Sequence, residues 1–154
     1  KCFGCKITYY STSGKNDNRE YERVELDDLL SSSDIISIHA PLNENTDNLI
    51  GYDEFVKMKD SAVILNLGRG RIINEADLTR ALNEDLISGA GLDVLEHEPI
   101  NKDNPLLSIQ DSIKLLITPH IAWASVEARK RVVVEVKENI KSFQKGIPRN
   151  VVTK

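Results

Sequence analysis

Residues 62–74, Ala-Val-Ile-Leu-Asn-Leu-Gly-Arg-Gly-Arg-Ile-Ile-Asn, join an apolar run to a polar turn and then to a helical pattern. The continuous run at residues 62–67 predicts a strand buried on both faces, as in parallel sheets. Ligands of open α/β sheets bind beyond the carboxyl ends of the strands, where this Gly-Arg-Gly turn lies. Arg69 sits between two glycines that would let the backbone approach a bound molecule. The alternative interpretation is an αL turn that carries a solvated arginine.

Strands and helices alternate along the 154 residues. This alternation predicts an α/β fold with a doubly wound, Rossmann-like parallel sheet covered by helices on both faces. Apolar runs predict strands at residues 6–10, 34–40, 62–67, 88–94 and 113–118. Helical segments are expected near residues 26–30, after a cap at Thr46 or Asp47, after a cap at Asn74, at 104–107, and from Ser125 to about Lys145.

The composition is ordinary for a soluble globular domain, with 40% hydrophobic and 29% charged residues and a net charge of -4. Lysines and arginines are scattered, so no nucleic-acid partner is expected. No apolar run is long enough for a membrane span and no signal peptide is seen, so we expect a cytoplasmic protein without a membrane partner. Cys2 and Cys5 have the spacing of a redox motif or half a zinc site, but no second cysteine pair exists, and no metal is expected.

Polar side chains follow the expected strands at their carboxyl ends. Because the carboxyl ends of parallel strands share one edge of the sheet, these side chains are expected to share one crevice. An arginine can hold a carboxylate through two hydrogen bonds, and a histidine beside a carboxylate can move a proton near neutral pH. Arginine, histidine and carboxylate side chains together fit a reaction on a small oxo or hydroxy acid. The residues concerned are Ser11–Ser13, His39, Arg69, Asp93 with Glu98, and His120.

Each of these residues also has a purely structural explanation. His39 could be a turn residue, Asp93 a turn cap, Glu98 a solvated loop charge and His120 a surface loop residue. Their shared placement at successive strand ends favours a functional site. No nucleophile elbow and no local zinc-ligand spacing accompany them.

Four segments of this sequence resemble the D-isomer-specific 2-hydroxyacid dehydrogenases, in that family's order and over nearly the whole chain. The last segment looks most like the glycerate dehydrogenase and hydroxypyruvate reductase branch. Glu98 argues against the formate dehydrogenase branch, which has no acid at the matching position. The segments are His-Ala-Pro-Leu at 39–42, Asn-Leu-Gly-Arg-Gly at 66–70, Gly-Leu-Asp-Val-Leu-Glu-His-Glu-Pro at 91–99, and Thr-Pro-His-Ile-Ala-Trp-Ala-Ser at 118–125.

The resemblance implies hydride transfer between a nicotinamide cofactor and a small D-2-hydroxy acid, such as glycerate (hydroxypyruvate) or glyoxylate. Arg69 would grip the substrate carboxylate and polarise the reacting carbonyl. His120 would exchange a proton with the carbonyl oxygen, and Glu98 would hydrogen-bond His120 and favour its protonated form. Asp93 would hold the nicotinamide carboxamide. The cofactor groove would be lined by Ser11, Ala40, Pro41, Thr46, Leu67, Gly68, Arg69, His120 and Ala122.

The expected cofactor is NAD, with NADP possible. NAD-preferring relatives usually carry an acid after the second strand to bond the ribose hydroxyls, whereas this chain has Ser11–Thr12–Ser13 there. A hydroxyl can bond a ribose without repelling a 2′-phosphate, and Lys15 could approach such a phosphate. The family also suggests a homodimer for the full-length enzyme.

The amino end departs from the family pattern. Family members begin with part of a substrate domain, then a strand and a Gly-x-Gly-x-x-Gly turn, whereas residues 1–4 look like the end of the helix after that turn. The absent strand would be central in the order 3-2-1-4-5-6, and the absent turn would bind the pyrophosphate. We therefore interpret residues 1–154 as a partial dinucleotide-binding domain that includes the C-terminal helix and lacks the substrate domain.

This interpretation has three consequences. The first two expected strands and the last three would lack a bridge, and two apolar strand edges would be exposed. The isolated fragment would be inactive and would bind dinucleotide poorly. The helix from Ser125 would show the apolar positions that face the absent domain, namely Val132, Val133, Val136 and Ile140.

Two other functions stay open. One is a non-catalytic NAD(H) sensor, akin to the corepressors that resemble these dehydrogenases. The other is a plain interaction module that has lost cofactor binding, which the absence of an upstream Gly-x-Gly-x-x-Gly would favour. The presence of Arg69, Glu98 and His120 disfavours a loss of catalysis.

Overall fold

A computed structural model of the protein describes residues 4–152. The chain divides into two compact units, one that ends at Pro119 and one that begins at His120. Residues 1–3 of the helix end expected at 1–4, Cys2 among them, lie outside the described residues, while Cys5 is exposed.

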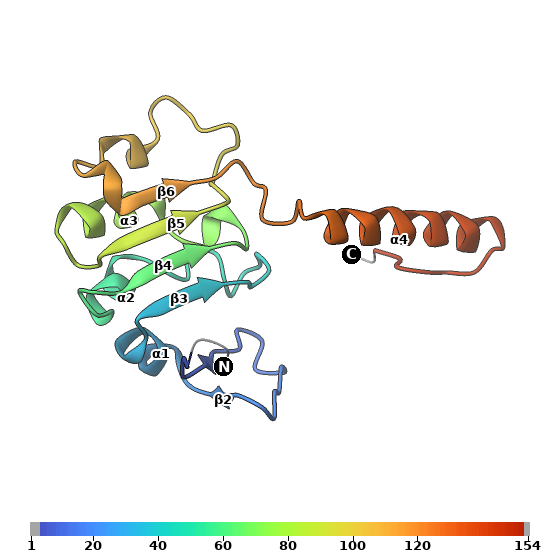
Figure 1. The fold of residues 1–154 in the computed structure, drawn as a ribbon, viewed down its shortest axis with the longest axis horizontal. Helices are drawn as coiled ribbons and strands as arrows, with labels where there is room; N and C mark the ends of the chain where they lie inside the picture. The colour runs from blue at the N-terminus through green and yellow to red at the C-terminus, as the bar shows by residue number, and fades with distance from the viewer. Residues whose placement is uncertain (1–3, 153–154) are drawn as a thin grey trace. The chain divides into compact units, whose positions relative to one another are not determined.

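The first unit contains two parallel sheets (Figure 1). The smaller sheet has two strands and the larger has four, in sequence order. All pairings are parallel, as predicted. The strands are β1 (Thr8–Tyr9) and β2 (Glu22–Arg23) in the first sheet, and β3 (Ile35–Ile38), β4 (Val63–Asn66), β5 (Gly89–Leu92) and β6 (Leu115–Ile117) in the second.

The break between the sheets lies elsewhere than expected. We expected residues 6–10 and 34–40 to share a group of strands, but β3 pairs with β4 from Ile35↔Val63 to Ile38↔Asn66. The partner of β1 is β2, two exposed charged residues without the apolar alternation that indicates a strand. The gap therefore falls between β2 and β3.

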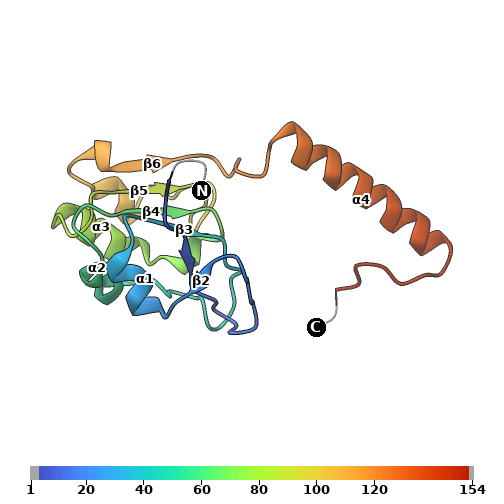
Figure 2. The ribbon, with the colours of Figure 1, turned by 60° about the horizontal axis from the view of Figure 1, so that its bottom comes forward.

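Helices of the first unit cover one face of the larger sheet (Figure 2). The register places Ile36, Ile38 and Ile64 on the face that the helices bury. Ile35 and Leu116 belong to the opposite face and are 66% and 67% exposed. The helices are α1 (Leu26–Ser32), α2 (Tyr52–Lys57) and α3 (Glu75–Asn83).

Two expectations are therefore wrong for this unit: a sheet covered on both faces and a β4 buried on both faces. Burial in β4 alternates, with Ile64 and Asn66 buried and Val63 and Leu65 half-buried. The cause is the strand order. The spatial order of the strands is the sequence order β3, β4, β5 and β6, so each connection steps across the sheet in the same direction. Right-handed crossovers therefore place α2 and α3 on the same side of the sheet.

The helix starts depend on local hydrogen bonds. Asn74 caps α3 as predicted, because its Oδ1 accepts the Asp77 N–H at 3.0 Å. The predicted cap of α2 at Thr46 or Asp47 is wrong. Gly51 precedes α2, and the Glu54 carboxylate accepts the Gly51 N–H at 3.1 Å.

Two 3₁₀ helices lie between β5 and β6. The expected turn at 104–107 is η2 (Pro105–Ser108), capped by the Asn104 Oδ1, which accepts the Leu106 N–H at 2.9 Å. The second, η3 (Ser112–Lys114), occupies residues expected to belong to the last strand.

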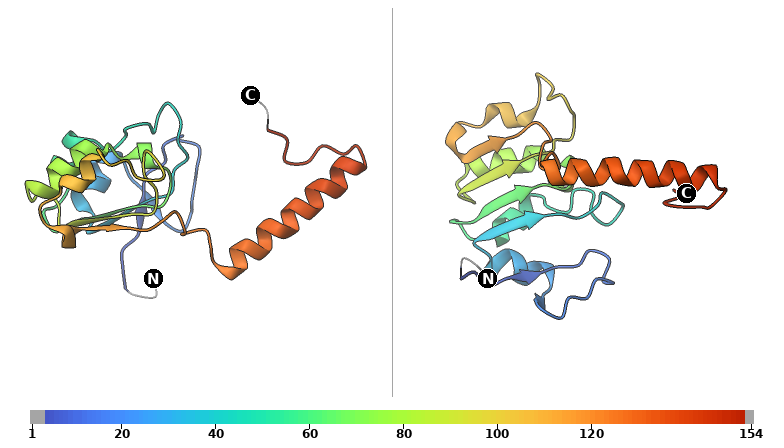
Figure 3. Two further views of the ribbon diagram at one scale, coloured as in Figure 1. Left: turned by 90° about the horizontal axis from the view of Figure 1, so that it is seen from above. Right: turned by 45° about the vertical axis from the view of Figure 1, so that its right-hand side comes forward.

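The second unit carries one long helix, α4 (Val126–Gln144), which Figure 3 shows as continuous. Ser125 caps it as predicted, accepting the Ala128 N–H at 3.2 Å, and Gly146 with φ +68° follows its end. The apolar positions expected to be uncovered are all more than half exposed, namely Val132, Val133, Val136 and Ile140. Among residues 4–152, no helix has both the length and the apolar character that a membrane crossing requires.

The turn after β4 packs directly on the loop after β5. Gly70 begins the short 3₁₀ helix η1 (Gly70–Ile72), and a Cβ built on it would lie 2.0 Å from both the carbonyl carbon and oxygen of Leu95. Backbone atoms cannot move aside as a side chain can. Glycine is therefore required at position 70.

We predict that Gly70→Ala lowers the free energy of unfolding by about 3 kcal/mol, because the methyl group overpacks a backbone contact. Urea denaturation measures the change. The matched control is Gly51→Ala, whose Cβ would meet only side-chain oxygens, the nearest at 3.2 Å. Gly51→Ala is expected to lower the free energy of unfolding by about 1 kcal/mol or less. Equal losses in the two variants would contradict the role assigned to Gly70.

Candidate active site

The carboxyl edge of the larger sheet brings together three of the connections singled out in the sequence. They are the turn at 67–70 after β4, the loop at 93–98 after β5, and the end of β6 at Thr118. The Asp93 N–H donates to the Asn66 carbonyl at 3.0 Å, and the Thr118 N–H donates to the Leu92 carbonyl at 2.9 Å. The three strand ends are thus in register at this edge.

Asn66 shapes the turn that presents Arg69. Its side chain is fully buried, its Oδ1 accepts the Gly68 N–H at 3.1 Å, and its Nδ2 donates to the Arg69 carbonyl at 2.9 Å. One amide thus satisfies two backbone groups that the sheet leaves unpaired. We assigned Asn66 no role from sequence, although a polar residue that ends an apolar run is a usable signal.

Arg69 is exposed, with an extended backbone at φ −146° and ψ 144°. Its Nη1 donates to the Gly68 carbonyl at 2.9 Å. Among residues 4–152 it forms no ion pair. An exposed guanidinium without an internal carboxylate partner can take an external carboxylate through two hydrogen bonds.

The two glycines beside Arg69 serve the packing of the chain. Neither has a positive φ, so the αL interpretation of this turn is wrong. A Cβ on Gly68 would lie 2.9 Å from the Ala40 carbonyl oxygen, and Gly70 faces Leu95. Both glycines admit neighbouring backbone, while the approach of a ligand to this turn stays a prediction.

The loop after β5 carries Glu98 next to the Arg69 turn. The Glu98 Oε1 accepts the Leu95 N–H at 2.9 Å, and Leu95 is the residue that packs on Gly70. Glu98 is exposed. The structure therefore places Arg69 and Glu98 on two connections in direct backbone contact.

Asp93 lies at the same edge and is 3% exposed. The Thr118 hydroxyl donates to its Oδ1 at 2.5 Å, which joins the ends of β5 and β6 through side chains. A buried carboxylate needs such donors, because desolvation of an unsatisfied charge is costly. We assigned Thr118 no role from sequence, although it opens the segment 118–125 that resembles the family.

His120 opens the second unit and adopts φ +53°, which is uncommon for a residue other than glycine. Its carbonyl accepts the Trp123 Nε1–H at 2.8 Å, and the Ala124 N–H donates to the Ile121 carbonyl at 2.9 Å. These bonds form a tight turn that also contains Ala122. Strained backbone at a chemically active side chain is a common property of active sites. The pair of His120 with Glu98 stays a prediction.

The expected cofactor residues differ in their surroundings. Ser11 is 5% exposed, and its hydroxyl has no hydrogen-bond partner among residues 4–152. Thr46 is fully buried, and its hydroxyl donates to the Pro41 carbonyl at 2.6 Å, so it shapes the loop 41–46. Ala40 is half-buried, while Pro41 and Leu67 are exposed.

The other polar residues singled out are placed as follows. His39 is exposed, and its Nε2 lies 2.9 Å from the Ser37 hydroxyl. Lys15 is exposed near Arg23, whose Nη1 donates to the Gly14 carbonyl at 2.9 Å.

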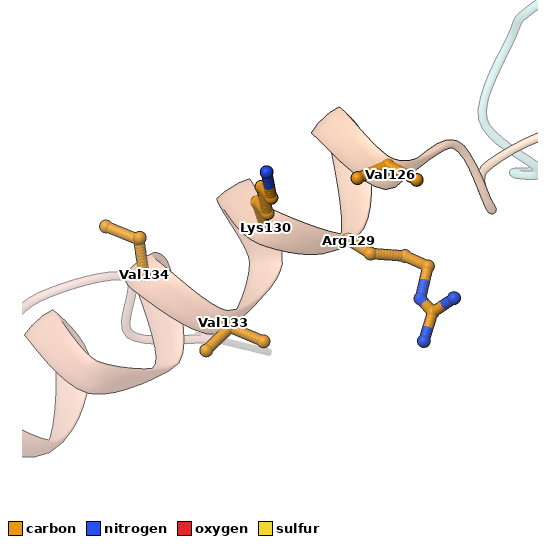
Figure 4. Close-up of a pocket in the computed structure, with 5 residues that line it drawn as sticks. All are labelled: Val126, Arg129, Lys130, Val133 and Val134. Atoms are coloured by element: carbon orange, nitrogen blue, oxygen red, sulfur yellow. The ribbon is translucent and has the colours of Figure 1, made fainter.

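Two surface hollows are lined by residues other than those of this edge. Figure 4 shows the first, whose five lining residues all project from α4, so it has one wall only. The second is lined by Asp60, Ser61, Asp85, Ile87, Ser88 and Lys114, and contains none of the expected site residues. Neither hollow tests the expected crevice at the sheet edge, which stays a prediction.

A separate surface cluster joins α2 to the end of α3. The Tyr52 hydroxyl donates to the Glu84 carboxylate at 2.6 Å, and the Arg80 Nε–H donates at 2.8 Å. These bonds hold the pKa of Glu84 below its usual range. The cluster shares no residue with the candidate site.

Comparison with known proteins identifies the family. The profile of the D-isomer specific 2-hydroxyacid dehydrogenase NAD binding domain matches residues 1–122. This chain belongs to that family. The Rossmann-like fold class expected from the sequence is confirmed by solved relatives that cover the chain.

Two curated relatives illustrate the similarity. The chain is 47% identical over 146 residues to a hydroxypyruvate reductase of Blautia hydrogenotrophica, covering 95% of this chain and 44% of that protein. It is 41% identical over 156 residues to a glyoxylate reductase of Korarchaeum cryptofilum, covering 99% of this chain and 46% of that protein. The chain thus spans about half the length of the curated relatives it matches.

Two solved structures are similar over 99% of this chain. An acyclic imino acid reductase in complex with NADPH and D-Arg has a TM-score of 0.87 and 35% identity, over 47% of its own chain. A D-isomer specific 2-hydroxyacid dehydrogenase from Lactobacillus delbrueckii ssp. bulgaricus, in its NAD complexed form, has a TM-score of 0.83 and 26% identity, over 50% of its own chain.

We predict that Asn66→Ala lowers the free energy of unfolding by about 1–3 kcal/mol, because the Gly68 N–H and the Arg69 carbonyl lose their partner in a buried turn. Asn66→Asp is expected to destabilise as well, since its carboxylate would face the Arg69 carbonyl. Asn45→Ala, at an exposed position, is the control and is expected to change stability by less than about 0.5 kcal/mol. Urea denaturation of the three variants measures this, and a wild-type midpoint for Asn66→Ala would contradict it.

Proposed function

We propose that this chain is the cofactor-binding part of an enzyme that transfers a hydride between NAD(P) and a small D-2-hydroxy acid or its oxo acid, such as glycerate/hydroxypyruvate or glyoxylate. The observation that carries the proposal is Arg69, an exposed guanidinium without an ion-pair partner among the described residues. Its turn is shaped by Asn66 and packs on the loop that carries Glu98. A positive group held at this edge suits a substrate that carries a carboxylate.

Arg69 would bind the substrate carboxylate with the guanidinium N–H groups that do not face Gly68. One of these groups would also lie close to the reacting carbonyl oxygen and stabilise the negative charge that develops there. The hydrogen bond from Nη1 to the Gly68 carbonyl, at 2.9 Å, restricts the side chain before substrate arrives.

His120 would donate a proton to the carbonyl oxygen during reduction and remove it during oxidation. Glu98 would hydrogen-bond the imidazole, favour its protonated form and fix its orientation. The αL backbone of His120 supports a functional role, because a conformation of this kind persists where the surroundings require it.

The residues present fit a nicotinamide dinucleotide, which supplies or accepts the hydride when it is bound. The buried Ser11 hydroxyl lacks a partner among residues 4–152 and can hydrogen-bond an adenosine ribose hydroxyl. Gly68 and Ala40, whose backbones lie in close contact, would line the cofactor groove. Asp93, fixed by Thr118, would bind the carboxamide.

We also propose that catalysis needs more sequence than these 154 residues. The relatives are about twice as long as this chain. Ile35 and Leu116 are exposed on the face of the larger sheet that the helices do not cover. A second domain would supply the opposite wall of the site and cover part of α4. A homodimer in the cytoplasm is proposed for the complete enzyme on the family resemblance.

We predict that, in the complete enzyme, Arg69→Ala lowers kcat/KM for the oxo acid by about 10²–10³-fold. Arg69→Lys should recover only a small part, because an ammonium lacks the planar fork. Arg71→Ala is the matched control, since Arg71 follows Arg69 by two positions and pairs with Asp47 on the surface. Steady-state reduction assays measure the three variants. An unchanged kcat/KM in Arg69→Ala would contradict the clamp.

We predict that His120→Ala lowers kcat by about 10²–10⁴-fold in the complete enzyme, because the proton donor is lost. Cofactor affinity, measured by fluorescence titration with NADH and NADPH, should change little. An NAD(H) sensor would be favoured instead if the wild-type protein shows no turnover and the His120→Ala variant keeps a regulatory activity.

We predict that the isolated 154-residue chain binds NADH weakly, with a dissociation constant of about 1 mM or more, which corresponds to a binding free energy of about 4 kcal/mol at most. Isothermal titration calorimetry measures the affinity, and the complete enzyme is the positive control. Micromolar binding by the isolated chain would contradict the need for further sequence.

A further inference from the structure

A buried carboxylate connects α3 to the loop that carries Glu98. Glu75 is the first residue of α3 and is 5% exposed. Its Oε1 accepts the Glu96 N–H at 2.7 Å, and its Oε2 accepts an N–H of the Asn104 Nδ2 at 2.7 Å. Both oxygens of the carboxylate are thus used by the segment 96–104.

The second partner is itself fixed. Asn104 is 8% exposed, and its Oδ1 accepts the Leu106 N–H at 2.9 Å as the cap of η2. That bond directs the Asn104 Nδ2 toward Glu75, so the amide cannot rotate without losing two hydrogen bonds. Glu75 also lies in the first turn of α3, where the helix dipole stabilises a negative charge.

The loop needs this attachment, because little of its own surface is buried. Glu96, His97, Glu98, Pro99 and Ile100 are all exposed. Packing therefore contributes little to the position of residues 96–100. The backbone at 95–96 is held on one side by Gly70 and on the other by Glu75.

Arg69 and Glu75 belong to one short continuous segment. Arg69 precedes η1, and α3 begins at Glu75, directly after the cap Asn74. Through Glu96, Glu75 ties the Glu98 loop to the same segment that presents the guanidinium. A displacement of the Glu96 backbone relative to this segment would require breaking a charge-assisted hydrogen bond of the buried Glu75 carboxylate.

We propose that Glu75 is a positioning residue, whose buried carboxylate holds the Leu95–Glu98 loop against the Arg69 turn and so sets the position of Glu98. This inference rests on the proposed function of Glu98 as the partner of His120. A carboxylate suits this position because two N–H donors converge on it, and the side-chain amide of glutamine offers only one acceptor.

The test uses the complete enzyme and compares E75Q with the double variant E75Q/N104D. In E75Q the new amide can accept from the Glu96 N–H but sets its own NH₂ against the Asn104 NH₂. In the double variant the new amide donates to the carboxylate at position 104, which still accepts the Leu106 N–H. All three hydrogen bonds are thereby restored. The matched control is E54Q, since Glu54 also accepts a backbone N–H at the start of a helix, at 3.1 Å.

The main readout is the pH dependence of kcat/KM for oxo-acid reduction. In the proposed mechanism Glu98 would hydrogen-bond the His120 imidazole and favour its protonated form, which reduction needs. Misplacement of Glu98 in E75Q should therefore move the alkaline limb of the kcat/KM profile to lower pH by about one unit. It should also lower kcat at neutral pH about tenfold. The double variant should recover both, and E54Q should change neither.

Hydrogen–deuterium exchange gives a second readout that does not depend on turnover. The amides of residues 95–104 should exchange faster in E75Q than in the wild type, and the double variant should restore their protection. Faster exchange with an unmoved pH limb would overturn the positioning role and leave Glu75 with a structural one. Unchanged exchange in E75Q would overturn the attachment itself. A wild-type enzyme without dehydrogenase turnover would refute the proposed function, while the exchange data would still report on the attachment.

Discussion

The contact between Gly70 and the Leu95–Glu96 backbone is the constraint on which the site depends. It brings the connection after β4 and the connection after β5 so close that no side chain fits between them. Arg69 and Glu98 flank this contact, so backbone packing sets the relative position of the two connections that carry them. Backbone contacts of this kind tolerate little change, since close-packed interiors cannot relax around an added methyl group.

Buried polar groups supply the rest of the order at this edge. Asn66 closes the Arg69 turn, Thr118 fixes Asp93, and Glu75 holds the loop beyond β5. The hydrogen bonds of Asn66 stay within its own turn. Those of Thr118 with Asp93 and of Glu75 with Glu96 join connections that are distant in sequence. A network in which each member has its partner holds one geometry, because any displacement leaves a desolvated group unpaired.

The sheet around this edge is covered on one face within the first unit. β3 to β6 are added in one direction, and the connecting helices therefore pack on the same side. Ile35 and Leu116 on the other face, like Val133 on α4, remain exposed. This distribution of apolar surface agrees with a chain that covers about half the length of its relatives.

The sequence by itself determined the parallel α/β fold, the caps Asn74 and Ser125, and the identities of Arg69, Glu98 and His120 as candidates, because periodicity, capping and residue chemistry are local properties. It also placed the candidates at strand ends, where neighbouring connections meet. Only the tertiary structure decided which strands pair, which face is covered, and why positions 68 and 70 are glycine. Those properties depend on contacts such as Gly70 with Leu95 and Glu75 with Glu96, between residues whose spacing in sequence carries no signal of their proximity.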